Sequence, residues 1–176
     1  KLITWKMADM LSLDLVEKGL VTDQLVLHIG YDIANLKGEA VSYSGDIKTD
    51  HYGRQVPVHA HGTINLSEPT SSSKEIDEAV KELFDRITDP TLSIRRINVT
   101  ANHVISERKA SADSGFVQLD FFTDQDEKCR QAEKKRISHE REKSLQQALL
   151  NIRHKYGKNA ILKGANYQSG ATARER

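Results

Sequence analysis

Two stretches of the chain repeat apolar residues at steps of three and four, as one face of a helix does. The first covers residues 1–18 and ends at Gly19, a residue typical of a left-handed helix cap. The second begins at Ser72, which forms a capping box with Glu75, and it stops before Pro90. Its apolar stripe comprises Ile76, Ala79, Val80, Leu83, Phe84 and Ile87. The pattern therefore predicts two amphipathic helices.

Three stretches, residues 24–31, 59–66 and 93–104, alternate apolar and polar residues, as half-buried strands do. The positions predicted to face inward are Leu25, Leu27, Ile29, Tyr31, Ala60, Gly62, Ile64, Leu66, Ile97, Val99 and Ala101. Residues 32–57 are polar and rich in Gly, Ser, Lys and Asp, so we expect a long mobile loop there. Together the patterns predict an α+β fold, in which two helices cover one face of a small antiparallel sheet.

The chain changes character after Asp124. Residues 128–144 are polar nearly all round, and one apolar stripe follows, formed by Leu145, Leu149, Ile152 and Tyr156. A continuous helix over residues 128–156 would be about 43 Å long. The tail, residues 158–176, has no period and should be loosely ordered. We divide the chain into a domain at 1–115, a linker segment at 116–123, and a charged helix with its tail at 124–176.

The first helical pattern begins at once, with no Ser, Thr, Asp or Asn before it as a cap. We therefore expect this sequence to be part of a longer protein, cut within or just before a helix.

The composition limits the classes of function. With 26 Lys and Arg against 25 Asp and Glu, the net charge is +1, so any basic surface must be local. One Cys excludes a disulfide framework within the chain. No apolar run approaches the roughly 18 residues that span a bilayer, and no signal peptide opens the sequence. We expect a soluble protein of the cytoplasm with no membrane partner.

The outward face of the predicted sheet has an unusual composition. It presents amide, hydroxyl, imidazole and guanidinium groups, and it has no carboxylate; its members are Gln24, His28, His59, His61, Thr63, Asn65, Arg96, Asn98, Thr100 and Asn102. Such a face suits a phosphate backbone, and Arg95 adds charge beside Arg96. An ordinary solvated sheet face explains the same pattern, and the residues alone leave both readings open.

Other chemistry is less well supported. His59 and His61 on one strand face could suggest a metal, but no third ligand is close in sequence, so contact with phosphate or sugar by neutral imidazoles is favoured. Lys37, Lys48 and Arg54 in the long loop could reach a nucleic-acid backbone. Four acids, Asp9, Asp14, Asp23 and Asp32, are expected to be surface charges.

Three segments carry a family resemblance: LDLVEKGLVTDQLVLHIGYD at 13–32, HYGRQVPVHAHGTINL at 51–66 and IRRINV at 94–99. They resemble the little-finger domain of Y-family translesion DNA polymerases, in the UmuC-like branch also called the ImpB/MucB/SamB family. The ending, residues 155–176, is similar to the C-terminal extension of such bacterial proteins. The resemblance implies that the sheet lies along primer-template duplex DNA. It also implies that the parent polymerase acts in DNA repair, damage tolerance and the SOS response.

The resemblance also implies what this chain lacks. The family's domain begins with a strand that this sequence does not contain, and its catalytic palm lies upstream. Without palm-like paired carboxylates, we expect no nucleotidyl transfer by this chain alone, and the Mg²⁺ ions would belong to the missing catalytic domain. The missing strand would leave an unpaired edge beside the third strand, so we expect the chain to self-associate.

A short apolar segment precedes the charged helix. Its residues Gln118, Leu119, Asp120, Phe121 and Phe122 resemble the bacterial sliding-clamp-binding motif, commonly written Q-L-S/D-L-F, with Phe121 where Leu is usual. By that likeness, Gln118 would bond at the rim of the clamp pocket, while Leu119, Phe121 and Phe122 would fill it. The alternative is a fourth strand, with Val117, Leu119 and Phe121 facing the core. Adjacent phenylalanines point to opposite sides of a strand, which favours a docking peptide.

Three functions follow, in this order. The first is a DNA-binding module tethered to the sliding clamp. The second is a protein-interaction module whose charged helix and tail bind partners of the replication machinery. The third is a self-contained enzyme, which ranks last because the sequence shows no nucleophile, acid–base pair or metal cluster.

Overall fold

The computed structural model describes residues 1–37, 45–113, 125–157 and 159–167. The helices are α1 (Leu2–Lys18), α2 (Ser73–Ile87), α3 (Glu107–Asp113) and α4 (Gln125–Tyr156), with short 3₁₀ helices η1 (Ile33–Leu36) and η2 (Gly164–Tyr167). The strands are β1 (Leu20–Tyr31), β2 (Ile47–Thr49), β3 (Gln55–Pro57), β4 (Ala60–Thr70), β5 (Ile94–Asn102) and β6 (Ile105–Ser106).

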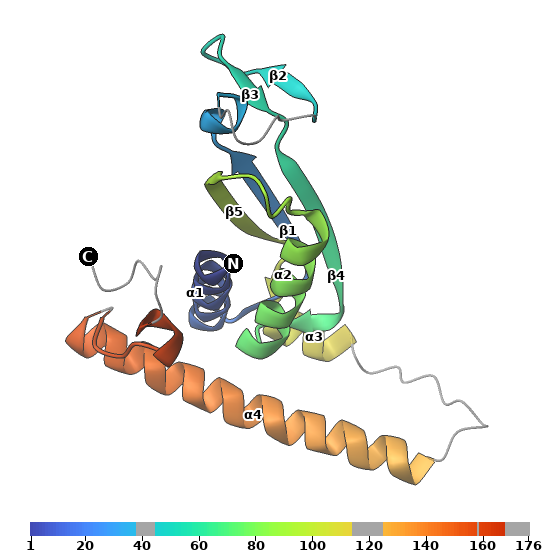
Figure 1. Ribbon diagram of the computed structural model, residues 1–176. Helices are drawn as coiled ribbons and strands as arrows, with labels where there is room; N and C mark the ends of the chain where they lie inside the picture. The colour runs from blue at the N-terminus through green and yellow to red at the C-terminus, as the bar shows by residue number, and fades with distance from the viewer. Residues whose placement is uncertain (38–44, 114–124, 158, 168–176) are drawn as a thin grey trace.

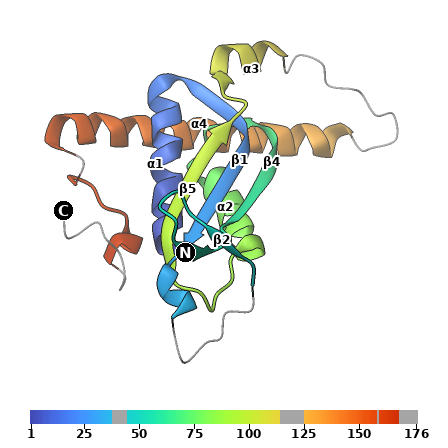
Figure 2. The same cartoon turned by 90° about the horizontal axis from the view of Figure 1, so that it is seen from above.

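The main sheet has the strand order β4-β1-β5, and all its pairs are antiparallel. The short β6 pairs with the start of β1, and β2 and β3 form a separate hairpin. Helices α1 and α2 pack side by side on one face of the sheet, α1 toward β5 and α2 toward β4 (Figures 1 and 2). The predicted α+β class, with two helices on one face of a small antiparallel sheet, is confirmed.

The core forms where the apolar stripe of α2, together with Ala8 and Leu15 of α1, meets the inward positions of β1. Leu25, Leu27 and Ile29 are fully buried, and they pack against residues of α2 such as Ile76 and Leu83. Each buried aliphatic side chain contributes about 1.5–3 kcal/mol, so this layer supplies most of the driving force for the fold. The alternation in β1 therefore fixes which face of the sheet is left for solvent or a partner.

Gly62 allows α2 to pack directly on β4. A Cβ at this position would lie 2.8 Å from Cγ2 of Ile87 and 3.0 Å from Cδ1 of Leu83. The first distance is shorter than real Cβ contacts and the second is tighter than most, so a side chain at position 62 would force Ile87 and Leu83 of α2 to shift.

The region predicted as a mobile loop contains regular structure, so that prediction is wrong for its described residues. Asp32 caps η1 by accepting a hydrogen bond from the backbone of Ala34, and Asn35 ties η1 to the backbone of Ser93 at the start of β5. The β2–β3 hairpin follows and lies beyond the end of the sheet, on the side opposite α4 (Figure 1). Polar side chains that pair with backbone groups stabilise this region, and they leave no apolar period to predict it from.

Helix α4 is 32 residues long, or about 48 Å, and lies across one end of the α1–α2 layer (Figure 1). The predicted apolar stripe is only partly right. Leu145 is 64% exposed and Tyr156 is 67% exposed, whereas Gln146 is 4% exposed. The face that docks therefore includes a buried glutamine, whose contacts with the start of α2 are hydrogen bonds.

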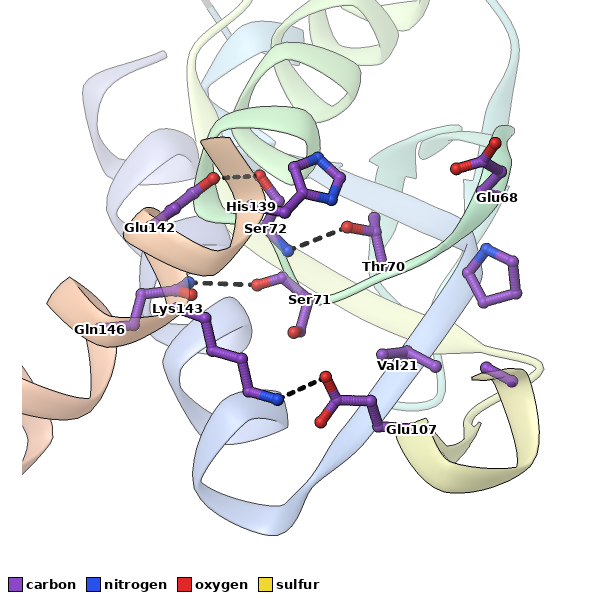
Figure 3. Close-up of a pocket in the computed structure, with 12 residues that line it drawn as sticks. Val21, Glu68, Thr70, Ser71, Ser72, Glu107, His139, Glu142, Lys143 and Gln146 are labelled. Atoms are coloured by element: carbon purple, nitrogen blue, oxygen red, sulfur yellow. Dashed lines mark hydrogen bonds and ion pairs between the residues drawn. The ribbon is translucent and has the colours of Figure 1, made fainter. Parts of the chain in front are cut away.

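Side chains of α4 make hydrogen bonds to the start of α2. The carboxylate of Glu142 accepts hydrogen bonds from the Ser72 hydroxyl at 2.7 Å and the Lys74 backbone N–H at 3.1 Å. The amide of Gln146 donates to the Ser73 hydroxyl at 2.8 Å and the Ser71 carbonyl at 3.1 Å. A carboxylate at a helix N-terminus also interacts favourably with the helix dipole. Figure 3 shows Glu142, Gln146, Ser71 and Ser72 around a cleft of about 270 Å³ between β4, α3, α4 and the residues that precede α2.

The expectation that Asp9 is a surface charge is wrong. Asp9 is 5% exposed and accepts a hydrogen bond from Lys163, in the segment that follows α4. The Lys163 ammonium lies 5.3 Å from the centre of the Trp5 ring. Asp77 of α2 is 8% exposed and belongs to the same group of charges. Part of the predicted loose tail is therefore bound to the helical layer.

Among the described strands, none pairs with the outer edge of β5, the edge on which the predicted self-association depends. None of the described helices combines the length and the apolar character that crossing a bilayer requires.

Candidate nucleic-acid interface

The sheet face opposite the helices gathers the predicted polar residues into rows across three strands. In the register of the sheet, Gln24 lies between Asn65 and Asn102, Val26 between Thr63 and Thr100, and His28 between His61 and Asn98. We call this surface the polar face; it comprises Gln24, His28, His59, His61, Thr63, Asn65, Arg96, Asn98, Thr100 and Asn102. None of these residues is acidic. The inward and outward assignments made from alternation are correct for these strands.

Amide side chains connect the row formed by Asn65, Gln24 and Asn102. Gln24 donates to the side-chain oxygen of Asn65 at 2.9 Å, and Asn102 donates to the side-chain oxygen of Gln24 at 3.0 Å. These bonds hold three amides in one orientation across the sheet. A surface whose polar groups are already ordered loses less entropy when it binds a partner.

Three imidazoles and one lysine meet further along the face. The ring centres of His28 and His59 are 4.2 Å apart, and those of His59 and His61 are 5.7 Å apart. Lys48 of β2 lies with its Nζ 2.6 Å from Nδ1 of His59. Since an ammonium can only donate, Nδ1 of His59 accepts, and the ring proton of the neutral imidazole is on Nε2. That N–H is a donor of the kind that phosphate and sugar oxygens accept.

The surroundings of His28 and His59 favour the neutral form of each ring. Burial lowers the pKa of His28, and the nearby His61, Lys48 and Arg96 lower it further. The pKa of His59 is also lowered, first by burial and then by Lys48 and the other two histidines. Both rings are therefore neutral at pH 7. Each can offer a partner one N–H donor and a flat aromatic face, but no positive charge. In the part of the chain that the structure describes, no group of three His, Cys, Asp or Glu residues could hold a metal ion.

Arg96 and Arg95 supply positive charge at one end of the polar face. Arg96 lies opposite Gly30 of β1, where a Cβ on the glycine would be 3.4 Å from the Arg96 Cβ. The register shifts after Gly30, so that Tyr31 pairs with Ile94 and Arg95 is the extra residue of a bulge. Strict alternation would have placed Arg95 on the helix side. Both arginines are exposed.

The structure adds one cation that sequence reasoning named only as part of a loop. Lys48 joins the polar face through His59, because the β2–β3 hairpin brings Lys48 next to the residue that precedes β4. Lys48 and His59 are eleven residues apart, and no strand period links them. Arg54, also named from the loop, lies at the hairpin turn, while Lys37 directly follows η1.

The predicted clamp-binding residues, Gln118, Leu119, Asp120, Phe121 and Phe122, lie outside the described residues. The alternative of a fourth strand at 116–122 falls on the same segment. Both interpretations stay predictions.

Comparison with known proteins identifies one family. The model of the impB/mucB/samB family C-terminal domain matches residues 2–121, which cover α1 to α3 and the whole sheet. No curated protein matches the chain.

Proposed function

Because the chain belongs to the impB/mucB/samB family, we propose that its polar face grips primer-template duplex DNA. The chain corresponds to the C-terminal, little-finger region of UmuC-like Y-family polymerases, in DNA damage tolerance. Within that role, the residues proposed to contact DNA are His28, His59, His61, Thr63, Asn65, Arg95, Arg96, Asn98 and Thr100. We further propose that the protein works in the cytoplasm.

The observation that carries this proposal is the composition of the polar face. Across three strands it offers donors at every row and no carboxylate, in a chain with 25 acidic residues. Strand β5 has nine residues, about 30 Å of strand, which equals roughly nine nucleotide steps along a DNA strand. The face is therefore long enough to follow about one turn of duplex.

Fluorescence anisotropy with a labelled primer-template duplex tests the proposal. Replacing Arg95 and Arg96 with Ala should weaken binding similarly across sequences and lower the slope of log affinity against log salt by about 2, one for each phosphate contact. Replacing Lys18 and Lys74 with Ala is the matched control, since both are exposed cations of the helical layer. A wild-type chain that binds no duplex at low salt, or a double Arg variant with the wild-type slope, would contradict the proposal.

We propose in addition that residues 118–122 tether the chain to the sliding clamp, on the strength of the motif likeness. In the sequence, the segment lies between the sheet domain and α4, where a clamp tether is expected. A peptide of residues 116–124 should bind the clamp at micromolar strength, and changing Gln118 and Leu119 to Ala should abolish that binding. Equal binding by both peptides in calorimetry would overturn the assignment.

A second candidate function uses α4 as a surface for partner proteins of the replication machinery. Leu145 and Tyr156 are largely exposed, and the helix extends past α1 and α2 at both ends (Figure 1). Under this candidate, Leu145→Glu would abolish partner binding and leave DNA affinity unchanged. Under the first proposal, the double Arg variant has the opposite effect.

A further inference from the structure

The turn of the β2–β3 hairpin is held in one conformation by Asp50. Its Oδ1 accepts hydrogen bonds from the backbone N–H groups of Tyr52 and Arg54, both at 2.9 Å. Its Oδ2 accepts from Nε and Nη2 of Arg54 at 2.9 and 2.7 Å. Gly53 has φ of 74°, the left-handed conformation that glycine adopts without strain. The hairpin is therefore preorganised.

This turn presents an aromatic ring to solvent. Tyr52 is 78% exposed. The guanidinium of Arg54 lies 5.1 Å from the centre of the Tyr52 ring, and the His51 ring meets it edge-on at 5.5 Å. A single exposed tyrosine is common on protein surfaces. Here, however, two neighbouring side chains and a rigid turn fix the ring in place, which is the arrangement of a stacking platform.

The hairpin is continuous with the polar face but differs from it in charge. Lys48 binds His59, so β2 begins where the polar face ends. In residues 46–57, Lys48 and Arg54 are balanced by Asp46 and Asp50. The Arg54 guanidinium is engaged by Asp50, which lowers the pKa of the Asp50 carboxyl and keeps it ionised. The turn therefore attracts phosphate weakly. The group that it offers to a partner is the exposed aromatic face of Tyr52.

We propose that the β2–β3 hairpin is a second nucleic-acid contact, in which Tyr52 stacks on an unpaired base of single-stranded DNA next to the duplex. This proposal rests on the proposed function of the polar face. A paired base is already stacked on both sides, so an exposed ring gains most from a base in an unpaired stretch. Arg54 is a positioning residue, because its guanidinium is held by Asp50 and lies against the Tyr52 ring.

The length of the hairpin sets where the contact falls. Tyr52 follows Lys48 by four residues, so it reaches at most about 13 Å past the polar face. That distance equals roughly four nucleotide steps. The stacked base is therefore within about four nucleotides of the duplex end held by the face.

Anisotropy with two DNA probes tests the proposal on the full chain: a blunt duplex, and the same duplex with a single-stranded extension of about eight nucleotides. Tyr52→Ala should weaken binding of the extended probe at least about fivefold and leave the blunt probe unchanged. The salt slope should stay at the wild-type value, since no phosphate contact is lost. Tyr52→Phe should bind like the wild type, and Tyr167→Ala, which removes another exposed ring, should have no effect.

The two probes separate this proposal from the function of the polar face. If Tyr52→Ala binds both probes like the wild type, or weakens both equally, the hairpin contact is wrong. The double Arg variant can still confirm the polar face in that case. If the wild type fails to bind the blunt probe but binds the extended one through Tyr52, the polar face is wrong, the placement of the base beside a duplex held by that face falls with it, and the stacking of Tyr52 on an unpaired base alone is supported. An unchanged circular-dichroism melting curve for Tyr52→Ala excludes misfolding as the cause of any loss.

Discussion

Replacing Asp77 with Asn should stabilise the protein at neutral pH. Asp77 lies on α2 and is 8% exposed, and among the described residues its Oδ1 has no hydrogen-bond partner. The carboxylate of Asp9 on α1 is nearby, whereas Lys163, Lys81 and the indole N–H of Trp5 favour the charged form. Burial has the largest effect, and with Asp9 it raises the pKa of Asp77 from 3.8 to about 6.

The size and sign of the effect follow from this pKa. A shift of about two units corresponds to about 3 kcal/mol of unfavourable free energy when Asp77 is ionised in the fold. Because the folded pKa lies above the unfolded pKa, the stability from the protonated form is complete below pH 3.8, and it is lost as the pH rises through about 6. Asn is neutral at every pH, so it removes this loss.

Thermal unfolding of the wild type and Asp77→Asn between pH 4.5 and 7.5 measures the effect. At pH 7.5 we expect a gain of about 2–3 kcal/mol, or about 4–12 °C in Tm for a chain of this size. The gain should shrink toward pH 4.5, where the wild-type carboxyl is protonated. Asp14→Asn is the matched control, an exposed carboxylate on α1 that should give little change. A variant that is less stable than the wild type at pH 7.5, or a gain independent of pH, would refute the reasoning.

Three further predictions concern packing and assembly. Glu142→Gln should weaken the docking of α4 by about 1–2 kcal/mol, since it removes the carboxylate at the start of α2. Faster hydrogen exchange in α4 would show this loss, and the control Glu140→Gln should leave the exchange unchanged. Gly62→Ala should destabilise the fold by about 1–3 kcal/mol in urea unfolding, because its Cβ would clash with α2, whereas Gly164→Ala meets open space and should be neutral. The open edge of β5 should make the chain self-associate at high concentration, and a strictly monomeric mass in light scattering would count against this.

The sequence predicted the parts of the fold that depend on apolar periodicity. The stripe of α2 and the alternation in β1, β4 and β5 reflect burial against one core, so they identified both faces of the sheet correctly. The docking of α4 could not be predicted this way, because its contacts run through Glu142 and Gln146. Polar contacts between distant segments leave no period in the sequence.

The contacts of several charged residues were also missed, because they join segments that are distant in the sequence. Aspartate is a residue type that usually lies on the surface. Only the contact with Lys163, 154 positions later, shows that Asp9 is buried and paired. The contact of Lys48 with His59 depends on a hairpin that the polar composition of residues 32–57 concealed. Arg95 lies in a bulge, which local alternation does not reveal.

The most direct test of the polar face as the DNA-binding surface is photo-cross-linking from single positions. A benzophenone amino acid placed at Asn98, exposed at the centre of β5, should cross-link to a bound primer-template duplex. The same group at Glu82, exposed on α2 on the helical side, should give only background. Cross-links from Glu82 with none from Asn98 would contradict the account, because the duplex would then lie against the helices and not along the sheet.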